Sequence, residues 1–207
     1  MDPKARYILE QVVRLYHRYG IKSVTMDEVA KQLGISKKTI YDFFSDKEDL
    51  VKQVLMFEHE LRCGFLSAIE EKKFNAIEEL FEVYKVINVM LKEYNASMEY
   101  DIRKYYPALF LKIREVRRRQ MYESVYSNLN QGKKEGLYRK ELNSKIIAKL
   151  HVFRTEGFFD TDIFTLEELS SMKMFHEIFV YHLNGILSHD GRVFFESNFD
   201  KFKATLS

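Results

Sequence analysis

The sequence has little of several residues that mark common protein classes. Its 207 residues include one cysteine, two prolines and no tryptophan. A single cysteine, Cys63, cannot form an internal disulfide, which excludes a disulfide-stapled scaffold and fits a reducing compartment. The prolines at positions 3 and 107 both suit the first turn of a helix. Because alternating apolar and polar segments bounded by turn signals are also absent, we predict an all-α fold.

An excess of one charge and long apolar runs are lacking too. The 33 basic and 31 acidic side chains leave a net charge of +2, too small for binding to nucleic acid by bulk charge. No apolar run approaches the ~20 residues that a transmembrane helix needs. Met1 leads directly into an amphipathic helix, so we expect no signal peptide. The sequence therefore predicts a cytoplasmic protein with no membrane partner.

What the sequence does contain is a run of helix signals that begins at Thr25. Thr25 and Glu28 have the spacing of a capping box. Gly34 stands where this helix has to stop, because glycine adopts the left-handed conformation without steric cost. Ser36 can then cap a second short helix. Two short helices at a sharp turn predict a helix-turn-helix, whose second helix enters the DNA major groove.

Helices on either side complete the predicted amino-terminal domain. Residues 4–19 carry apolar side chains at helical spacing and would pack on the helix-turn-helix to form a three-helix head. Ser45 and Glu48 have the spacing of a further capping box, which begins a long helix. We predict a DNA-binding domain over residues 1–47 and a larger helical domain over residues 48–207.

Two lysines stand in the first turn of the predicted recognition helix. The helix macrodipole disfavours cations there by a few tenths of a kcal/mol each, up to ~1, so selection for stability alone would place acidic residues. Lys37 and Lys38, with the hydroxyls of Ser36, Thr39 and Tyr41, form a surface suited to phosphates and base edges. The alternative is a solvated lysine pair on an ordinary helical hairpin.

Residues 21–50 resemble the DNA-binding signature of the tetracycline-repressor (TetR) family of bacterial transcription regulators. The resemblance rests on Thr25, Val29-Ala30, Gly34-Ile35-Ser36, Thr39-Ile40-Tyr41, Phe44 and Lys47-Glu48-x-Leu50. It implies a homodimeric regulator, usually a repressor, that binds a palindromic operator in double-stranded DNA and is released by a small molecule. Residue by residue, it implies DNA contacts at Thr25, Ser36, Lys37, Lys38, Thr39, Tyr41, Asp42, Phe43 and Lys47.

The resemblance assigns different roles to these positions. Lys37 and Lys38 would reach base edges or nearby phosphates, and the contacts to the phosphate backbone would come from Thr25, Thr39, Tyr41 and Lys47. Asp42 departs from the family pattern, in which an aromatic residue or histidine is commoner. A carboxylate near phosphates lowers affinity unless it accepts a hydrogen bond from a cytosine amino group, which leaves the role of Asp42 open.

The resemblance also implies a ligand pocket among the helices that follow the head. With 17 Phe and 13 Tyr, the chain suits an apolar or aromatic small-molecule effector. Most aromatic residues at helical spacing belong to a core, so we expect only part of the candidate lining to face a ligand. The candidates are Phe57, His59, Phe81, Tyr84, Asn88, Tyr105, Phe110 and Met121.

The last long helix, expected over residues 165–188 with Thr165 and Glu168 as its cap, is apolar on two sides. A surface helix of a monomer needs only one apolar stripe, so the excess predicts a homodimer interface shared with residues 145–156. The alternative is a helix central to its own core. The residues expected in the interface are Met172, Phe175, Phe179, Leu183 and Ile186.

Motifs for other chemistry are missing. No Gly-rich phosphate loop, G-x-S-x-G elbow or H-E-x-x-H site occurs. His59 and Cys63 are four residues apart, but no further pair of ligands completes a metal site, so packing is favoured. We predict no catalytic residue, no metal and no cofactor. Two rival classes stay open: an enzyme, which needs clustered carboxylates and a perturbed histidine in a pocket, and a protein-interaction module, whose binding would not weaken steeply with salt.

Overall fold

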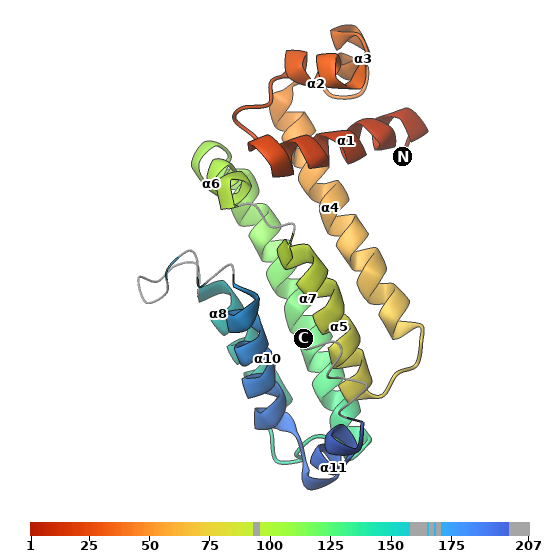
Figure 1. The fold of residues 1–207 in the computed structure, drawn as a ribbon, viewed down its shortest axis with the longest axis vertical. Helices are drawn as coiled ribbons and strands as arrows, with labels where there is room; N and C mark the ends of the chain where they lie inside the picture. Colours follow the sequence, from red (N-terminus) through yellow and green to blue (C-terminus); the bar gives the residue numbers. More distant parts are fainter. Residues whose placement is uncertain (93–95, 158–164, 166–167, 169–170, 199–207) are drawn as a thin grey trace. The chain divides into compact units, whose positions relative to one another are not determined.

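The computed structural model describes residues 1–92, 96–157, 165, 168 and 171–198. Within them the regular structure is helical, apart from one isolated bridge between Tyr138 and Leu187, and the predicted all-α class is confirmed (Figure 1). The helices are α1 (Pro3–Tyr19), α2 (Met26–Leu33), α3 (Lys37–Tyr41), α4 (Lys47–Glu70), α5 (Ala76–Lys92), α6 (Ala96–Tyr105), α7 (Pro107–Lys134), α8 (Ser144–Gly157), α10 (Met172–Ile186) and α11 (His189–Ser197).

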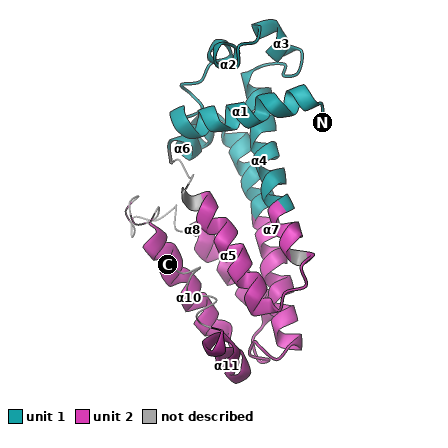
Figure 2. Cartoon of the chain, turned by 45° about the vertical axis from the view of Figure 1, so that its right-hand side comes forward, with its two compact units in different colours: residues 1–64, 93–117 teal, residues 65–92, 118–207 magenta. Residues whose placement is uncertain are grey.

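The chain divides into two compact units (Figure 2). The head unit consists of Met1–Gly64 and Glu93–Arg117, and the second unit of Phe65–Lys92 and Arg118–Ser207. Helices α4 and α7 each continue from one unit into the other. The unit around the helix-turn-helix therefore includes α6 and the start of α7, which no local sequence pattern connected with it.

The core of the head unit explains why α6 belongs to it. Helix α1 buries one apolar face, including Ile8 and Val12, against α2, α3 and α4. Met98 and Ile102 of α6 are buried in the same core. Asp101 of α6, itself buried, accepts a hydrogen bond of 2.8 Å from the backbone N–H of Lys22, in the turn between α1 and α2. Helix α6 therefore fixes the turn that leads into the helix-turn-helix.

Local signals set the ends of the helix-turn-helix as predicted. Thr25 Oγ1 accepts from the N–H of Glu28 at 3.1 Å, which caps α2. Gly34 ends α2 in the left-handed conformation, with φ of 64°. Ser36 Oγ accepts from the N–H of Thr39 at 3.0 Å, which caps α3. The turn between the helices is thus built from side chains that are local in the sequence.

The cap of α4 lies one residue later than predicted. Asp46 Oδ1 accepts from the N–H of Asp49 at 2.8 Å, and the Asp49 carboxylate accepts from the N–H of Ser45 at 3.1 Å. The predicted capping box of Ser45 and Glu48 is therefore wrong. Because a carboxylate is as good a cap as a serine hydroxyl, the local sequence permits either register.

The last long helix begins later than predicted. Thr165 and Glu168 do form the reciprocal hydrogen bonds of a capping box, with N–H to oxygen distances of 2.8 and 3.2 Å. However, α10 begins at Met172, capped by Ser171 Oγ, which accepts from the N–H of Met174 at 3.1 Å. Most of the residues between the two capping signals lie outside the part of the chain that the structure describes.

The second unit packs α5 against α10 and α11 through aromatic side chains. Tyr84 stacks on Phe175, with ring centroids 4.9 Å apart and an interplanar angle of 9°. Phe81 meets Phe179 edge-on at 5.1 Å and stacks on Phe195 at 5.9 Å. Edge-on and stacked geometries are the favourable ones for aromatic pairs. These contacts occupy the inner face of α5.

A pair of histidines joins α8 to α10 in this unit. The rings of His151 and His182 meet edge-on with centroids 4.8 Å apart, and Arg154 Nη2 lies 3.3 Å from Nδ1 of His151. Burial, together with Arg154, lowers the pKa of His151 to about 4. Burial, together with His151 and Arg154, lowers the pKa of His182 to about 3. Both rings are therefore neutral in the folded protein near pH 7.

We expect the free energy of unfolding to fall between pH 6.5 and pH 4. Both imidazoles titrate at roughly pH 6.5 in an unfolded chain, so in this window the unfolded state binds more protons than the folded one. The loss reaches up to about 2 kcal/mol per imidazole at pH 5. Thermal unfolding at pH 7 and pH 5 measures this loss.

His182→Gln should flatten the pH dependence, whereas His189→Gln, at an exposed position of α11, should not. A wild-type melting temperature equal at both pH values contradicts this assignment.

Candidate nucleic-acid interface

Most side chains predicted to contact DNA lie on the surface around α3. The exposed ones are Thr25, Ser36, Lys37, Lys38, Tyr41 and Asp42, while Thr39, Phe43 and Lys47 are half-buried. Ile40 is fully buried and fixes α3 to the head core. One side of this short helix is thus held by the core, and the other carries the lysines and hydroxyls outward.

The hydroxyls at the starts of α2 and α3 can still supply hydrogen-bond donors. Thr25 Oγ1 acts as an acceptor from the helix backbone, and so does Ser36 Oγ. Ser36 Oγ also lies 2.9 Å from Thr39 Oγ1, so one of these two hydroxyls donates to the other. Because a hydroxyl has one hydrogen as well as two acceptor lone pairs, Thr25 and one member of the Ser36–Thr39 pair can still donate to a phosphate oxygen.

The two lysines of α3 differ in their surroundings. The ammonium of Lys37 lies 3.0 Å from the carboxylate of Asp27 in the first turn of α2. The hydrogen bond and the charge of Asp27 raise the pKa of Lys37. Lys38 is exposed beside it. Lys37 is thus oriented by an acid of α2, a residue that the sequence pattern did not single out.

The residues at the end of α3 divide between surface and core. The ring of Tyr41 is 45% exposed, which leaves its hydroxyl accessible to a phosphate. Asp42 is the exposed C-cap of α3, and its backbone N–H donates to the carbonyl of Lys38 at 2.9 Å. Phe43 packs against the head core, with its ring centroid 6.4 Å from that of Phe44. Phe43 therefore has a packing role within the head.

Lys47 sits at the start of α4 and is partly withdrawn from solvent. Its Nζ donates to the carbonyl oxygen of Lys22 at 3.4 Å. Burial lowers the pKa of Lys47, and the nearby charge of Asp101 opposes this shift. The ammonium thus lies between the turn before α2 and the first turn of α4, close to backbone that precedes the helix-turn-helix.

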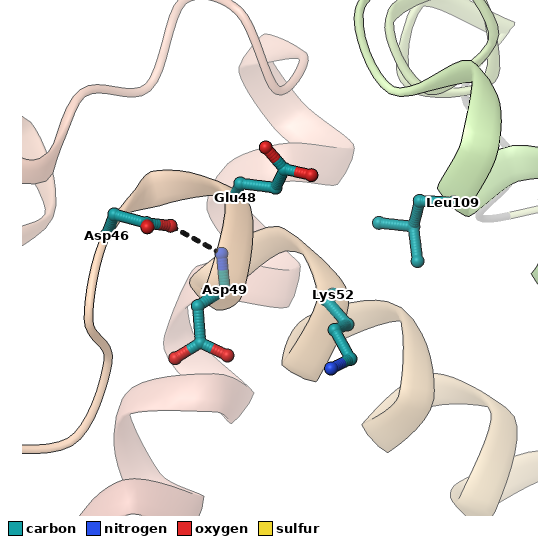
Figure 3. A pocket seen from close by; sticks show the side chains of 5 residues that line it. All are labelled: Asp46, Glu48, Asp49, Lys52 and Leu109. Carbon is teal, nitrogen blue, oxygen red and sulfur yellow. Dashed lines mark hydrogen bonds between the residues drawn. The ribbon is translucent and has the colours of Figure 1, made fainter.

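A hollow in the head unit has the wrong charge for DNA. It encloses about 240 Å³ and is lined by Asp46, Glu48, Asp49, Lys52 and Leu109 (Figure 3). Two of the carboxylates, Asp46 and Asp49, accept hydrogen bonds from backbone N–H groups at the start of α4. Because three carboxylates repel phosphate, this hollow is unfavourable for nucleic acid, and the candidate surface around α3 does not include it.

The predicted ligand-lining residues are divided between the two units. Phe57, His59, Tyr105 and Phe110 belong to the head unit, and Phe81, Tyr84, Asn88 and Met121 to the second unit. Several of them have partners within their own unit: Phe57 is in the head core, Phe81 and Tyr84 are in the aromatic cluster, and His59 Nε2 lies 3.5 Å from Cys63 Sγ. Asn88 is different, because its Oδ1 is buried and has no hydrogen-bond partner among the residues that the structure describes.

The residues predicted for a dimer interface face inward. Phe179, Leu183 and Ile186 are at most 8% exposed and belong to the core of the second unit. Phe175 packs against that core, and Met172 is half-buried. This stripe of α10 therefore corresponds to the alternative of a helix central to its own core.

A different apolar face is left open on α8. Ile146, Leu150 and Phe153 are 54%, 55% and 75% exposed, and α10 adds Tyr181 at 77%. The three α8 residues have the i, i+4, i+7 spacing of one helix face. Their spacing is visible in the sequence, but periodicity does not tell which apolar face of a helix turns inward.

These features define a DNA-binding protein of the helix-turn-helix class, with a basic recognition helix on an all-α scaffold. A family model described as bacterial regulatory proteins, tetR family, matches residues 8–54. This match covers the whole helix-turn-helix, and together with curated relatives that are HTH-type transcriptional regulators it supports a DNA-binding transcriptional regulator of the tetR family.

Relatives and solved structures agree with this assignment. The chain is 22% identical to the HTH-type transcriptional regulator YvaF of Bacillus subtilis, over 88% of this chain and 95% of that one. It has the fold of a transcriptional regulator from Cytophaga hutchinsonii (TM-score 0.74, 21% identity, 90% of this chain and 100% of that one). It also has the fold of a gamma-butyrolactone receptor (TM-score 0.65, 14% identity, 97% of this chain and 96% of that one). None of the helices in the described residues has the length and apolar character that crossing a membrane requires.

Proposed function

We propose that the protein is a homodimeric repressor that binds a palindromic operator and leaves it when a small molecule binds. The main support for this mode of DNA binding is the set of exposed hydrogen-bond donors around α3. They are two ammonium groups, the Tyr41 hydroxyl and the capping hydroxyls. Such groups donate to phosphate oxygens and base edges, and the buried Ile40 keeps α3 in place.

In this proposal each subunit places α3 in a major groove. Lys37 and Lys38 reach base edges in the groove or the nearest phosphates. Thr25, Thr39 and Tyr41 hold the phosphate backbone. Lys47 contributes a further phosphate contact from the start of α4. A two-fold dimer matches an inverted repeat, because each half-site then meets one recognition helix in the same orientation.

The second copy is proposed to dock on the apolar face of α8. Three large apolar side chains at one-face spacing are more than half exposed there, and α10 adds a tyrosine. Exposed apolar patches of this kind mark protein interaction sites. The interface thus uses α8 and α10, as the sequence predicted, but through the outer face of α8 instead of the inner stripe of α10.

The proposed effector is a small apolar or aromatic molecule. The abundance of phenylalanine and tyrosine supports this, and one protein of the same fold is a gamma-butyrolactone receptor. The protein would act in the cytoplasm, where the bacterial chromosome lies, and would regulate transcription by binding rather than by catalysis.

Selection of sites from randomised duplex DNA tests the proposal. Purified protein should enrich a palindrome, and log affinity for it should fall linearly with log salt concentration. If nothing is enriched at low salt, the selection is repeated on protein unfolded and refolded to remove any bound effector. Failure of both selections would show that the head has a partner other than DNA.

Replacing both lysines of α3 by alanine should weaken binding to the selected site. Each lost base contact costs ~1–3 kcal/mol of binding free energy. By contrast, Lys47→Ala should weaken binding to all sequences alike and reduce the salt slope by about one unit. Titrations of the selected and a random duplex at several salt concentrations measure both effects. Lys52→Ala, among the carboxylates of the hollow, is the matched control. Unchanged binding in the α3 and Lys47 variants would show that these lysines do not contact DNA and that α3 does not lie in the major groove.

A further inference from the structure

The ion pair between α2 and α3 places a carboxylate at the recognition helix. Asp27 is in the first turn of α2 and Lys37 in the first turn of α3, ten positions later in the chain. Their side chains are 73% and 47% exposed, and the Asp27 carboxylate lies 3.0 Å from Lys37 Nζ. In this geometry a carboxylate oxygen of Asp27 therefore lies within hydrogen-bond distance of the Lys37 ammonium.

The helix macrodipole favours a carboxylate in the first turn of α2, but the ion pair with Lys37 adds little stability of its own. Ion pairs between exposed side chains contribute little to stability, because water and salt screen them. A carboxylate beside a DNA-binding surface also repels phosphate and lowers affinity for every sequence. An exposed acid at this place therefore acts against binding unless the DNA offers it a hydrogen-bond donor.

The major groove offers such a donor on cytosine. A G·C pair presents the O6 and N7 acceptors of guanine beside the N4 amino donor of cytosine. Lysine is a usual ligand of guanine O6 and N7, and an acidic side chain accepts from cytosine N4. Because O6 and N4 are neighbours within one base pair, a lysine and a carboxylate 3.0 Å apart match a single G·C pair.

We infer that Asp27 and Lys37 read one G·C pair in each half-site together, with Lys37 donating to guanine and Asp27 accepting from the cytosine amino group. The inference rests on the proposed function, since it requires α3 in the major groove. It makes Asp27, a residue of α2, a determinant of sequence specificity. It also gives Lys37 and Lys38 distinct roles, because only Lys37 is paired with an acid.

Parallel selections with wild-type protein, Asp27→Ala and Lys37→Ala test this inference. The wild type should select a G·C pair at one position of each half-site. Both variants should lose the preference at that same position, by about 5- to 150-fold, and keep the remaining positions. Asp27→Asn, which removes the charge with little change in shape, should also bind random duplex more tightly than wild type because a repulsive charge is gone.

Glu10→Gln is the matched control. Glu10 is an exposed acid on α1 that pairs with Arg6 at 3.0 Å, so the substitution makes the same change in net charge. Its selected site should equal that of the wild type. The inference is overturned if Asp27→Ala keeps the full preference, if Asp27→Ala and Lys37→Ala lose different positions, or if the lost position is A·T. Absence of any site for the wild type overturns the proposed function instead, and the inference with it.

Discussion

A chain carrying Leu150→Glu and Phe153→Glu is expected to elute as a monomer and to bind a palindromic site roughly a hundredfold or more weakly. Both side chains are more than half exposed on α8, so the substitutions leave the core of the second unit intact. A two-fold interface brings the same patch of both copies together, so four new carboxylates meet there, which adds repulsion to the loss of apolar burial. DNA affinity falls because a dimer binds its second half-site at a high effective concentration, and a monomer does not.

Size-exclusion chromatography with light scattering and operator titration measure the two effects separately. The control is Val89→Glu, which adds one carboxylate at a position of α5 that is 60% exposed. It should leave both the mass and the affinity unchanged. A double variant that remains a dimer would place the second copy elsewhere. A monomer with undiminished affinity would mean that the two half-sites are not bound together.

The sequence was most informative where structure depends on neighbours along the chain. The cap at Ser36 and the left-handed Gly34 follow from side chains within a few residues, and both are confirmed. The start of α4 shows the limit of this reasoning. Ser45 and Asp46 are both good caps, and the structure uses Asp46. A local rule cannot decide between two equally good local solutions.

What the sequence could not reveal depends on contacts between distant segments. Helix α6 belongs to the head unit because Met98 and Ile102 are buried in its core and because Asp101 accepts a hydrogen bond from the backbone N–H of Lys22. Lys22 and Asp101 are 79 positions apart in the sequence. The ion pair between Lys37 and Asp27 could not be predicted either, because in the sequence Asp27 looks like an ordinary acidic residue in the first turn of a helix. On α10, two apolar faces were visible, but only the packing against α5 shows which one is the core.

Glycine is a common mark of a loop, but Gly132 lies inside α7. The structural reason is Tyr138, whose ring occupies the space that a side chain at position 132 would need. A Cβ built on Gly132 would lie 2.1 Å from Cδ2 and 2.4 Å from Cε2 of Tyr138. The loop follows Lys134, the last residue of α7, and contains Gly136 with a φ of 77°.

Gly132→Ala is expected to lower the free energy of unfolding by on the order of 3 kcal/mol, the upper end for overpacking a core. The Tyr138 ring cannot move aside easily, because it is fully buried and its hydroxyl lies 3.0 Å from both the Ala76 carbonyl and Asn128 Oδ1. For a chain of this length the loss corresponds to a melting temperature lower by roughly 6–12 °C.

Gly185→Ala is the control that separates this clash from the general effect of adding a methyl group to a helix. Gly185 lies in α10, and a Cβ there meets nothing within 4 Å. Alanine is the better helix former by ~1 kcal/mol, so this variant should melt at a higher temperature than wild type. Opposite signs for the same substitution in two helices follow only if Tyr138 fills the space beside Gly132. Equal melting temperatures for the two variants would instead mean that this ring does not pack on α7 as described.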